Sequence, residues 1–449
     1  MITRIVAALL CAALVPAAAI AQPAAQGEEL TLKAALQLAL ANNRQVQVAL
    51  LNVEKADAQL EVSRLRRLPK FELEATASQL LTPVGFSFPR GAFGEFPGTG
   101  PIPADDTTVS VPLQPTFYLT SQVSQPLTQL FRINLGIRSA EASRDIERER
   151  ARAQQLSIAD QVKRTYFAIL QTESALNALD ESIALYRELD RTLQVRVLQQ
   201  VALRSDSLDV QYQLAQAELS RTVRRNAIAT QKEQLNQLLG RDIRTAFDVA
   251  TVSEIALTDV DLEAAQARAL ASRPDVREAQ LTLKQAELDR RLSRADRIPE
   301  VSLAVSYSSY FNMSVLPSNL ATAGVKVTWE PFDWGRKNRE LAVKTHTVQQ
   351  ARLSVRDAED RAALELSSRF RTLAEKRAQL TVARAAQGTA REKLRVKTNQ
   401  FEVQAVLLPD VLQQRASLAD ADDAYQQAIL AFWVAKADFE KAIGEEVIP

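Results

Sequence analysis

The segment IPEVSLAVSYSS, residues 298–309, alternates apolar residues with small or polar ones, and it follows a long polar stretch. Residues 68–79, LPKFELEATASQ, show the same alternation after an equivalent apolar-Pro step. Successive side chains of a β-strand point to opposite faces, so each segment predicts a strand with one apolar and one polar face. Such strands suit a half-buried sheet or the wall of a membrane barrel.

The two segments belong to an internal duplication of the chain. Residues 230 positions apart match without gaps around the predicted strands: Leu40 with Leu270, Val46 with Val276, Ala49 with Ala279, Pro69 with Pro299 and Leu73 with Leu303. Later in each half the offset is 205, where Pro126 matches Pro331 and Arg164 matches Arg369. Each half therefore reads as helix, strand, loop, strand, long helix, turn and helix, and this repeat determines the architecture.

Long uninterrupted helices are predicted for most of the chain. Residues 137–239 contain neither Gly nor Pro, and residues 333–408 contain no Pro. In the first run, residues recur at the three- and four-residue steps of a coiled-coil seam, with Asp190 at the one polar step; the apolar ones are Leu176, Leu179, Ile183, Tyr186, Leu193 and Val197. A single helix over residues 131–200 would be about 105 Å long at 1.5 Å per residue. Globular domains do not contain helices of this length.

Aromatic residues concentrate in the two strand-containing segments. Residues 69–132 and 299–334 hold 14 of the 25 aromatic residues of the chain. This enrichment favours the aromatic belts of a membrane interface, and a small β-subdomain with an aromatic core is the alternative. The aromatic residues expected at the interface are Phe71, Phe117, Tyr307, Tyr310, Trp329 and Trp334.

The composition excludes several functional classes. The chain has 55 Lys and Arg against 54 Asp and Glu, and a net charge of +1 argues against nucleic acid as the main partner. One His and one Cys are too few for a His- or Cys-rich metal site or a Ser-His-Asp triad. We therefore expect no enzyme and no cofactor. The lone His346 and the paired Asp422 and Asp423 are interpreted as solvated residues of charged helices.

The first residues form a predicted secretory signal peptide. Arg4 precedes an apolar stretch from Ile5 to Ile20, and Ala19-Ile20-Ala21 has the small-x-small pattern of a cleavage site. Cleavage would start the mature chain at Gln22; a membrane-anchor helix is the competing interpretation. No later segment approaches 18 apolar residues, so no transmembrane helix is expected.

Geometry limits how the predicted strands can be used. Each chain offers four strands, two per half, whereas a membrane barrel needs at least about eight. Several chains must therefore share one barrel if the strands cross a membrane. Helices of about 100 Å exceed the roughly 30 Å hydrocarbon core several times and must extend into solvent.

With these features the chain resembles the TolC-like outer-membrane efflux proteins over nearly all of its mature sequence. Three segments carry the resemblance: Leu30 to Leu36 (LTLKAAL) at the start, Ala269 to Val276 (ALASRPDV) at the opening of the second half, and Pro331 to Gly335 (PFDWG) at the return to helix. The resemblance implies a homotrimer with a shared twelve-stranded barrel in the outer membrane and a helical tunnel across the periplasm. It also implies two partners, a periplasmic adaptor protein and an inner-membrane transporter.

The resemblance assigns roles to the turns between the paired long helices. Asp206 and Asp410 align with the acidic ring that lines the closed entrance in the family, and Asp209 lies on the same helix face as Asp206. Helix N-capping is the alternative role for these carboxylates. The residues expected to contact the adaptor are Gln200, Val201, Leu203, Arg204, Gln404, Val406 and Leu408. Gln200 and Gln404 depart from the family, which usually has Gly at these positions.

The expected organisation follows from these assignments. The expected segments are a signal peptide (1–21), periplasmic helices (22–68), a first hairpin (69–130) with a long extracellular loop (83–112), a helical hairpin (131–240), a linker (241–262), a periplasmic helix (263–298), a second hairpin (299–334) and a final helical hairpin (335–449). The expected function is a passive exit duct of a tripartite efflux or type I secretion system, in the outer membrane and the periplasm. The alternative is a periplasmic adaptor with one long coiled-coil hairpin, and a purely structural coiled coil is a third possibility.

Overall fold

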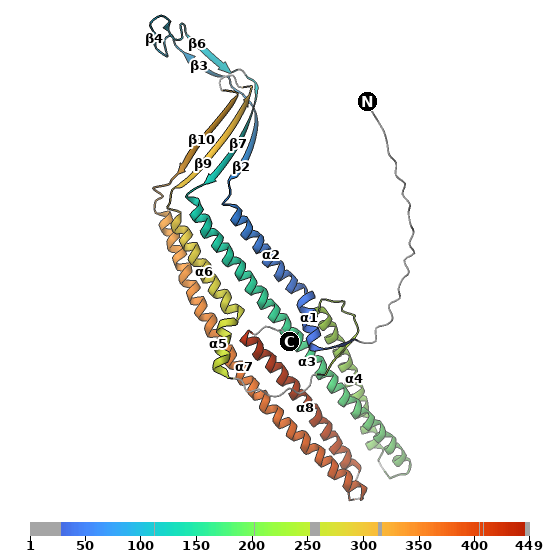
Figure 1. The fold of residues 1–449 in the computed structure, drawn as a ribbon. Coiled ribbons are helices and arrows are strands. Elements are labelled where there is room, and N and C mark those ends of the chain that lie inside the picture. The colour runs from blue at the N-terminus through green and yellow to red at the C-terminus, as the bar shows by residue number, and fades with distance from the viewer. Residues whose placement is uncertain are drawn as a thin grey trace, which may run out of the picture.

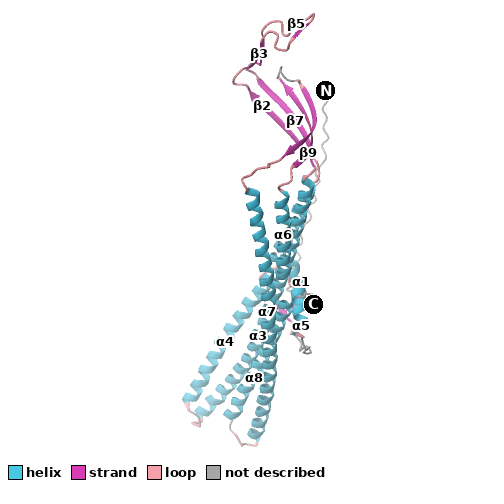
Figure 2. Ribbon diagram, turned by 90° about the vertical axis from the view of Figure 1, so that its left-hand side faces the viewer, coloured by secondary structure: helices cyan, strands magenta, loops and turns pink. Residues whose placement is uncertain are grey.

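The computed structural model describes residues 28–111, 113–201, 203–251, 261–312, 317–403, 405–406 and 408–444. The chain forms a long curved ribbon with a β-sheet at one end and two helical hairpin tips at the other (Figure 1, Figure 2). The predicted signal peptide and its cleavage site lie outside the described residues. Among the helices of the described part, none is both long and apolar enough to cross a membrane.

The sheet contains four antiparallel strands in the order β10-β9-β7-β2. Its strands are β2 (Lys70–Gln79), β7 (Pro115–Pro126), β9 (Glu300–Phe311) and β10 (Asn319–Thr328). β2 and β7 come from the first repeat and β9 and β10 from the second, and the pairing of β7 with β9 joins the two repeats. The mainly helical fold with a duplicated repeat and four strands, predicted from the sequence, is confirmed.

Two helices run through the whole helical part of the ribbon. α3 (Gln129–Leu198) has 70 residues and α7 (Arg336–Glu402) has 67. Towards the sheet they are accompanied by α2 (Arg44–Leu65) and α6 (Pro274–Ala295), and towards the tips by α4 (Arg204–Leu238) and α8 (Leu408–Ile443). Packing follows the order α2-α3-α6-α7 near the sheet and α4-α3-α8-α7 near the tips.

The main core lies where these two sets of helices meet. Two short helices, α1 (Leu32–Asn42) and α5 (Leu262–Ser272), pack here, and β1 (Glu28–Leu30) pairs in parallel with β8 (Phe247–Val249). Tyr166 of α3 is fully buried, and its hydroxyl donates to the carbonyl of Leu30 at 2.9 Å or of Ala250 at 2.7 Å. Burial raises the pKa of Tyr166 to about 12. This core packs α1, α3 and α8 against one another at the middle of the ribbon.

The predicted long loop of the first hairpin contains paired strands. β3 (Val84–Phe88) pairs with β6 (Thr107–Val111), and β4 (Glu95–Phe96) pairs with β5 (Gly100–Pro101). The many Gly and Pro residues of this segment indicated only a loop, because they mark turns without showing which flanking residues pair. The insertion therefore extends the first hairpin as a small β-arm beyond the sheet (Figure 1).

Candidate functional site: the two-faced sheet and the helix tips

The four-stranded sheet separates apolar from polar side chains. One row across it pairs Phe71 with Val123, Val123 with Val305 and Val305 with Ala323. This register puts the following residues on the same apolar face: Leu73, Ala75, Ala77, Phe117, Leu119, Val301, Leu303, Tyr307, Phe311, Val325 and Val327. The opposite face presents Lys70, Glu72, Glu74, Thr76, Ser78, Thr116, Thr120, Gln122, Ser306, Ser308, Thr322 and Lys326. Both faces are open in the single chain, so the sheet can separate an apolar medium from an aqueous one.

The aromatic residues predicted at the membrane interface do not all share one face. Phe71, Phe117 and Tyr307 belong to the apolar face, whereas Tyr310 lies on the polar face, where its ring is 6.2 Å from that of Tyr118. The two predicted tryptophans follow the end of β10.

Of these two, Trp334 is 91% exposed, and its ring meets that of Phe332 edge-on with centroids 4.9 Å apart. An exposed tryptophan at the junction of sheet and helices is typical of a residue held at a lipid–water boundary.

Both outer strands of the sheet have a free edge. Within the described residues β2 pairs only with β7 and β10 only with β9, so one row of backbone N–H and C=O groups on each outer strand has no strand partner. Unpaired strand edges are templates for pairing with another chain.

The helices continue the same two edges along the ribbon. α7 forms the edge below β10, while α2 and then α4 form the edge below β2. Large apolar side chains are exposed on these edge helices: Val48, Leu51, Val62 and Leu65 on α2, Leu208, Tyr212, Leu219 and Val223 on α4, and Val343, Leu353, Leu364 and Val382 on α7. Several recur at multiples of seven residues, as expected for helix-to-helix seams.

The predicted acidic residues lie on two separate tips in the single chain. Asp209 is exposed on α4, and Asp410 is exposed in the first turn of α8. The backbone of Asp206 belongs to the first turn of α4, and its side chain is outside the described set. One chain does not bring the two tips together (Figure 1).

The predicted adaptor-contact residues surround the same turns. Val201 is 74% exposed and Leu203 68%, and Arg204 is also exposed at the start of α4. Gln200 has φ +59°, the left-handed conformation that glycine adopts without strain. The usual glycine is therefore replaced at a position that still keeps the glycine-like backbone. In the second tip Val406 is half-buried, Gln404 lies outside the described residues, and Leu408 is described only as the first residue of α8.

A charge network between α3, α7 and α8 was missed by sequence reasoning. Asp438 accepts hydrogen bonds from Arg164 and, at 3.2 Å, from Arg369, which are equivalent residues of the two repeats. Asp160 accepts from Arg164 at 3.2 Å and from Lys441 at 2.9 Å, and both aspartates are only 8% exposed. Burial lowers the pKa of Arg164, but the charges of Asp160 and Asp438 more than offset it, so the pKa is raised. The match of Arg164 with Arg369 was the available signal, but their shared partner was not predictable.

Other residues considered from the sequence have ordinary surroundings. His346 is exposed, with Nδ1 3.2 Å from Oε1 of Gln349. Asp422 accepts a hydrogen bond from Gln387 at 2.8 Å, and Asp423 accepts one from Gln427 at 2.7 Å. In the described part of the chain, no cluster of three or more His, Cys, Asp and Glu is placed to hold a metal ion.

Comparison with known proteins gives one family match. A sequence model of the family described as "Outer membrane efflux protein" matches residues 35–241 and 266–445. Among curated proteins, an uncharacterized protein of Haemophilus influenzae is 26% identical over 242 residues, which make up 52% of this chain and 52% of that protein. The chain thus spans about half the length of this curated relative.

Several solved structures share the fold. The outer membrane channel CmeC of Campylobacter jejuni has a TM-score of 0.75 at 18% identity and covers 92% of this chain and 85% of its own. The outer membrane protein VceC of Vibrio cholerae has a TM-score of 0.72 at 16% identity, with 92% and 96% covered. The open state of the MtrE outer membrane channel of Neisseria gonorrhoeae has a TM-score of 0.72 at 18% identity, with 92% and 88% covered. At these identities the likeness concerns the fold.

Proposed function

This chain belongs to the outer membrane efflux protein family, and we propose that it is the exit duct of a tripartite efflux or type I secretion system. The family is described as that of outer-membrane proteins that serve efflux, and the duct would be a passive conduit rather than an enzyme. The duct would carry small molecules or proteins across the periplasm and the outer membrane. The observation that carries the proposal is the two-faced sheet with free edges, continued by helices with free edges on the same two sides.

Closure of a ring from copies of the chain supports this proposal. Three copies of a four-stranded sheet supply twelve strands, and joining β10 of one copy to β2 of the next would leave no free edge. Two copies would supply only eight strands, and the interior of an eight-stranded barrel is filled by its own side chains. A homotrimer is therefore the smallest ring with an open lumen.

The helical edges support the same arrangement. In a head-to-tail ring each α7 would lie against α2 and α4 of the neighbouring copy, and the exposed apolar side chains of these helices would be buried. The polar face of the sheet would line the lumen, and the apolar face would meet the lipid of the outer membrane.

The partners are inferred from the tips. We propose that a periplasmic adaptor contacts the exposed turn that contains Val201, Leu203 and Arg204, together with the second tip at Val406 and Leu408, and that the adaptor connects the duct to an inner-membrane transporter. Exposed apolar residues at a turn are otherwise costly to leave in water. An adaptor role for this chain itself is disfavoured, because the model of the outer membrane efflux protein family matches both halves of the chain, residues 35–241 and 266–445.

The proposed membrane position can be tested with arginine substitutions on the two faces of β10. Val325→Arg and Val327→Arg would each put a charge on the apolar face, at a cost of up to about 2–4 kcal/mol per chain near the bilayer midplane. Because each trimer would bear three such charges, we expect loss of heat-resistant trimer from the outer-membrane fraction. Thr322→Arg, on the polar face of the same strand, is the matched control and should assemble. Equal assembly of all three variants would refute lipid contact at the apolar face.

The entrance is proposed to be acidic. In a trimer Asp206, Asp209 and Asp410 would place up to nine carboxylates around the periplasmic mouth, and this negative charge would favour the passage of cations. We propose that the mouth is closed at rest and is opened by the adaptor. Planar-bilayer recordings of the double variant Asp209→Asn/Asp410→Asn should show weaker cation selectivity and weaker block by multivalent cations, with the trimer intact. Unchanged selectivity and block would leave only the capping role for these carboxylates.

A further inference from the structure

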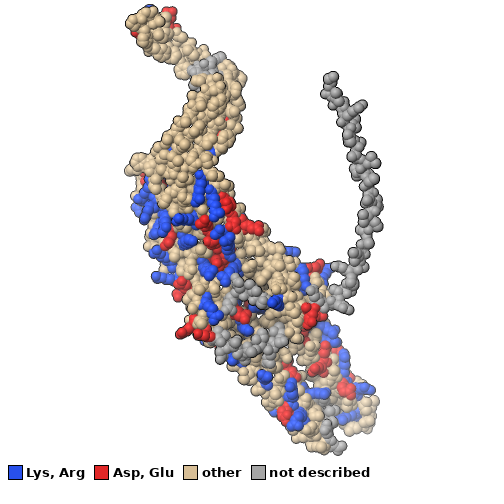
Figure 3. All heavy atoms as spheres, in the orientation of Figure 1, with Lys and Arg blue, Asp and Glu red and all other residues tan. Residues whose placement is uncertain are grey.

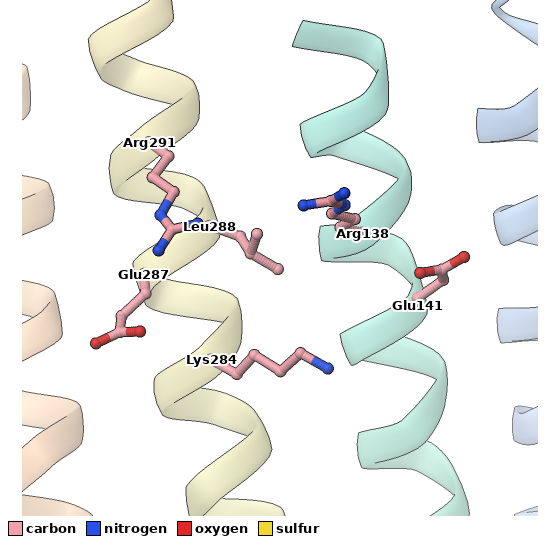
Figure 4. A pocket seen from close by; sticks show the side chains of 6 residues that line it. All are labelled: Arg138, Glu141, Lys284, Glu287, Leu288 and Arg291. Atoms are coloured by element: carbon pink, nitrogen blue, oxygen red, sulfur yellow. The ribbon is translucent and has the colours of Figure 1, made fainter. Parts of the chain in front are cut away.

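A basic groove opens between α3 and α6 close to the sheet. Its volume is about 430 Å³, and it is lined by Arg138, Glu141, Lys284, Glu287, Leu288 and Arg291. Figure 4 shows Arg138 and Lys284 in the space between the two helices, whereas Glu141 and Glu287 turn away to opposite sides. We call this feature the α3–α6 groove.

The positive charges of the groove are not neutralised by its carboxylates. Glu141 is bound by Arg64 of α2 at 3.3 Å, and Glu287 is bound by Arg352 of α7 at 3.3 Å. Across the described residues, the side chains of Arg138, Lys284 and Arg291 make no hydrogen bond or ion pair, and all three are exposed. Both carboxylates are thus in contact with arginines from outside the groove, although Arg64 is also shared with Glu61 at 2.7 Å, so the groove keeps a net positive charge.

The excess charge is confined to the sheet end of the two helices. A second hollow of about 400 Å³ lies further from the sheet between the same helices. There Arg148 is 3.8 Å from Asp145, and Arg277 is 3.6 Å from Glu149. The cations of this second hollow, apart from the shared Lys284, are paired, so unpaired charge is not a general property of the α3–α6 interface.

The groove opens on the same side of the ribbon as the apolar face of the sheet. The sheet surface seen in Figure 3 is almost free of charged residues, and the polar face holds Lys70, Glu72, Glu74 and Lys326, so the apolar face is in view. Figure 4 shows α7, α6, α3 and α2 in the same left-to-right order as Figure 1, with Arg291 above Lys284. The groove is therefore viewed from that same side.

Backbone hydrogen bonds give the same assignment. The N–H of Leu80 donates to the carbonyl of Gln114, so even-numbered residues of β2 direct their backbone groups towards β7. In Figure 1 β2 rises to the right of β7. Because the residues are L-amino acids, the even-numbered side chains of β2 then point away from the viewer of Figure 1. The odd-numbered ones, among them Phe71 and Leu73, point towards the viewer.

The sheet end of the groove lies at the depth of the headgroup layer if the apolar face lies in lipid. Arg291 is four residues from the end of α6, about 6 Å along the helix axis, whereas Arg138, nine residues into α3, and Lys284, eleven residues from the end of α6, lie deeper, at about 14 Å and 17 Å. A headgroup layer extends roughly 5–8 Å beyond the hydrocarbon, and long basic side chains reach towards it along apolar surface. The exposed Trp334, two residues before α7, marks the same boundary.

We propose that the α3–α6 groove binds the phosphate headgroup of an anionic phospholipid in the periplasmic leaflet of the outer membrane. This inference rests on the proposed membrane position of the apolar face. Arg138 and Lys284, which reach into the space between the two helices, bind the phosphate oxygens, and Arg291 on α6 adds positive charge beside them; the acyl chains run upward along the apolar face of β7 and β9. A lipid of this charge neutralises the cations that the protein leaves unpaired.

The test compares two double variants of the full chain purified in detergent. Arg138→Gln/Arg291→Gln removes two cations of the groove, and Arg148→Gln/Arg277→Gln removes two paired arginines from the second hollow. Native mass spectrometry with added phosphatidylglycerol or phosphatidylcholine measures lipid bound per trimer. We expect the unmodified protein to prefer phosphatidylglycerol. The first variant should lose about fivefold in affinity for each cation removed, and the second should lose less than twofold.

The possible outcomes separate this inference from the proposed function. Intact trimers without preference for phosphatidylglycerol, or equal losses in both variants, would overturn the lipid site while leaving the duct proposal standing. Displacement of the lipid by inorganic phosphate alone would show a free-anion site and would overturn the lipid assignment. Failure of the unmodified protein to stay with membranes after carbonate extraction would instead refute the membrane position itself.

Discussion

The two repeats build the same helix break with different side chains. In the first repeat α1 gives way to α2 at Asn43, and the adjacent Asn42 faces the glycine turn after α4, Gly240. In the second repeat α5 gives way to α6 at Arg273, which faces the glycine turn after α8, Gly444. Both glycines have positive φ, +71° and +77°. The repeats therefore share a backbone solution.

One asparagine in the first repeat has the roles of two residues in the second. Asn43 donates to the carbonyl of Leu238 at 2.8 Å, and its Oδ1 accepts from the N–H groups that open α2. Arg273 donates to the equivalent carbonyl of Ala442 at 3.0 Å, but it cannot accept, and Asp275 accepts the N–H of Val276 instead. The duplicated backbone is thus maintained, while its polar roles are redistributed among neighbouring residues.

The cores around the two breaks also differ. The core beside Asn43 includes Tyr166, Phe167 and Trp433 and joins α1, α3, α4 and α8. The core beside Arg273 is smaller, and Arg273 adds ion pairs to Asp275 at 2.9 Å and to Glu365 at 2.8 Å. Apolar packing thus contributes more in the first repeat, and charge pairing contributes more in the second.

The largest difference between the repeats should appear at the two glycines. A Cβ at position 240 would lie 2.2 Å from the carbonyl oxygen of Asn42, whereas one at position 444 would lie 3.0 Å from Cα of Arg273. Gly240→Ala combines left-handed strain with a backbone clash, and we expect a loss of about 2–5 kcal/mol. Gly444→Ala should lose about 1–2 kcal/mol, mainly from strain. Urea unfolding followed by circular dichroism measures both, and equal losses would contradict the tighter approach at Gly240.

A smaller effect is expected for the capping residues. Asn43→Ala removes the cap of α2 and the donor to the carbonyl of Leu238, for an expected loss of about 2–3 kcal/mol. Asp275→Ala removes only the accepting role and an exposed ion pair, for about 1 kcal/mol. The same unfolding experiment ranks the two variants. A larger loss for Asp275→Ala would show that the second repeat depends on its ion pairs more than the geometry indicates.

The smallest effect concerns acid. Burial raises the pKa of Asp275, but the hydrogen bonds and charge of Arg273 outweigh it, so the pKa is lowered. A carboxyl with a lowered folded-state pKa contributes stability above its ordinary pKa of about 4 and loses it as pH falls further. Asp275→Asn should therefore be less stable by less than about 1 kcal/mol at pH 7 and should show a weaker acid-induced loss. Melting curves of the unmodified protein and of Asp275→Asn should differ at pH 7 and should lie closer together below pH 4. An equal separation of the two curves at both pH values would contradict this origin of the difference.

Much of the fold could be predicted because periodicity encodes it directly. The alternation around Phe71 and Leu303 gave the faces of the sheet, and the matching residues at offsets of 230 and 205 gave the repeat. The pairing inside the β-arm was not predictable, because Gly and Pro mark turns but not partners.

The polar clusters were harder to predict than the fold. The partners in the Asp438 network come from three helices, and Arg164 is 274 residues from Asp438 along the chain. The same holds for Arg138 and Arg291, which are ordinary surface arginines in sequence and become a cluster only when α3 and α6 pack side by side. The acidic entrance and the adaptor contacts stay predictions.

The helix ends at the middle of the ribbon have a mechanical consequence. α2, α4, α6 and α8 all begin or end near this level, and only α3 and α7 pass through it. Bending and torsion applied at the tips therefore reach the sheet mainly through two continuous helices per chain, because the other four long helices are interrupted at this level. The middle of the molecule is where the fewest helices are continuous, so torsional compliance is greatest there and less of the strain at the tips reaches the sheet.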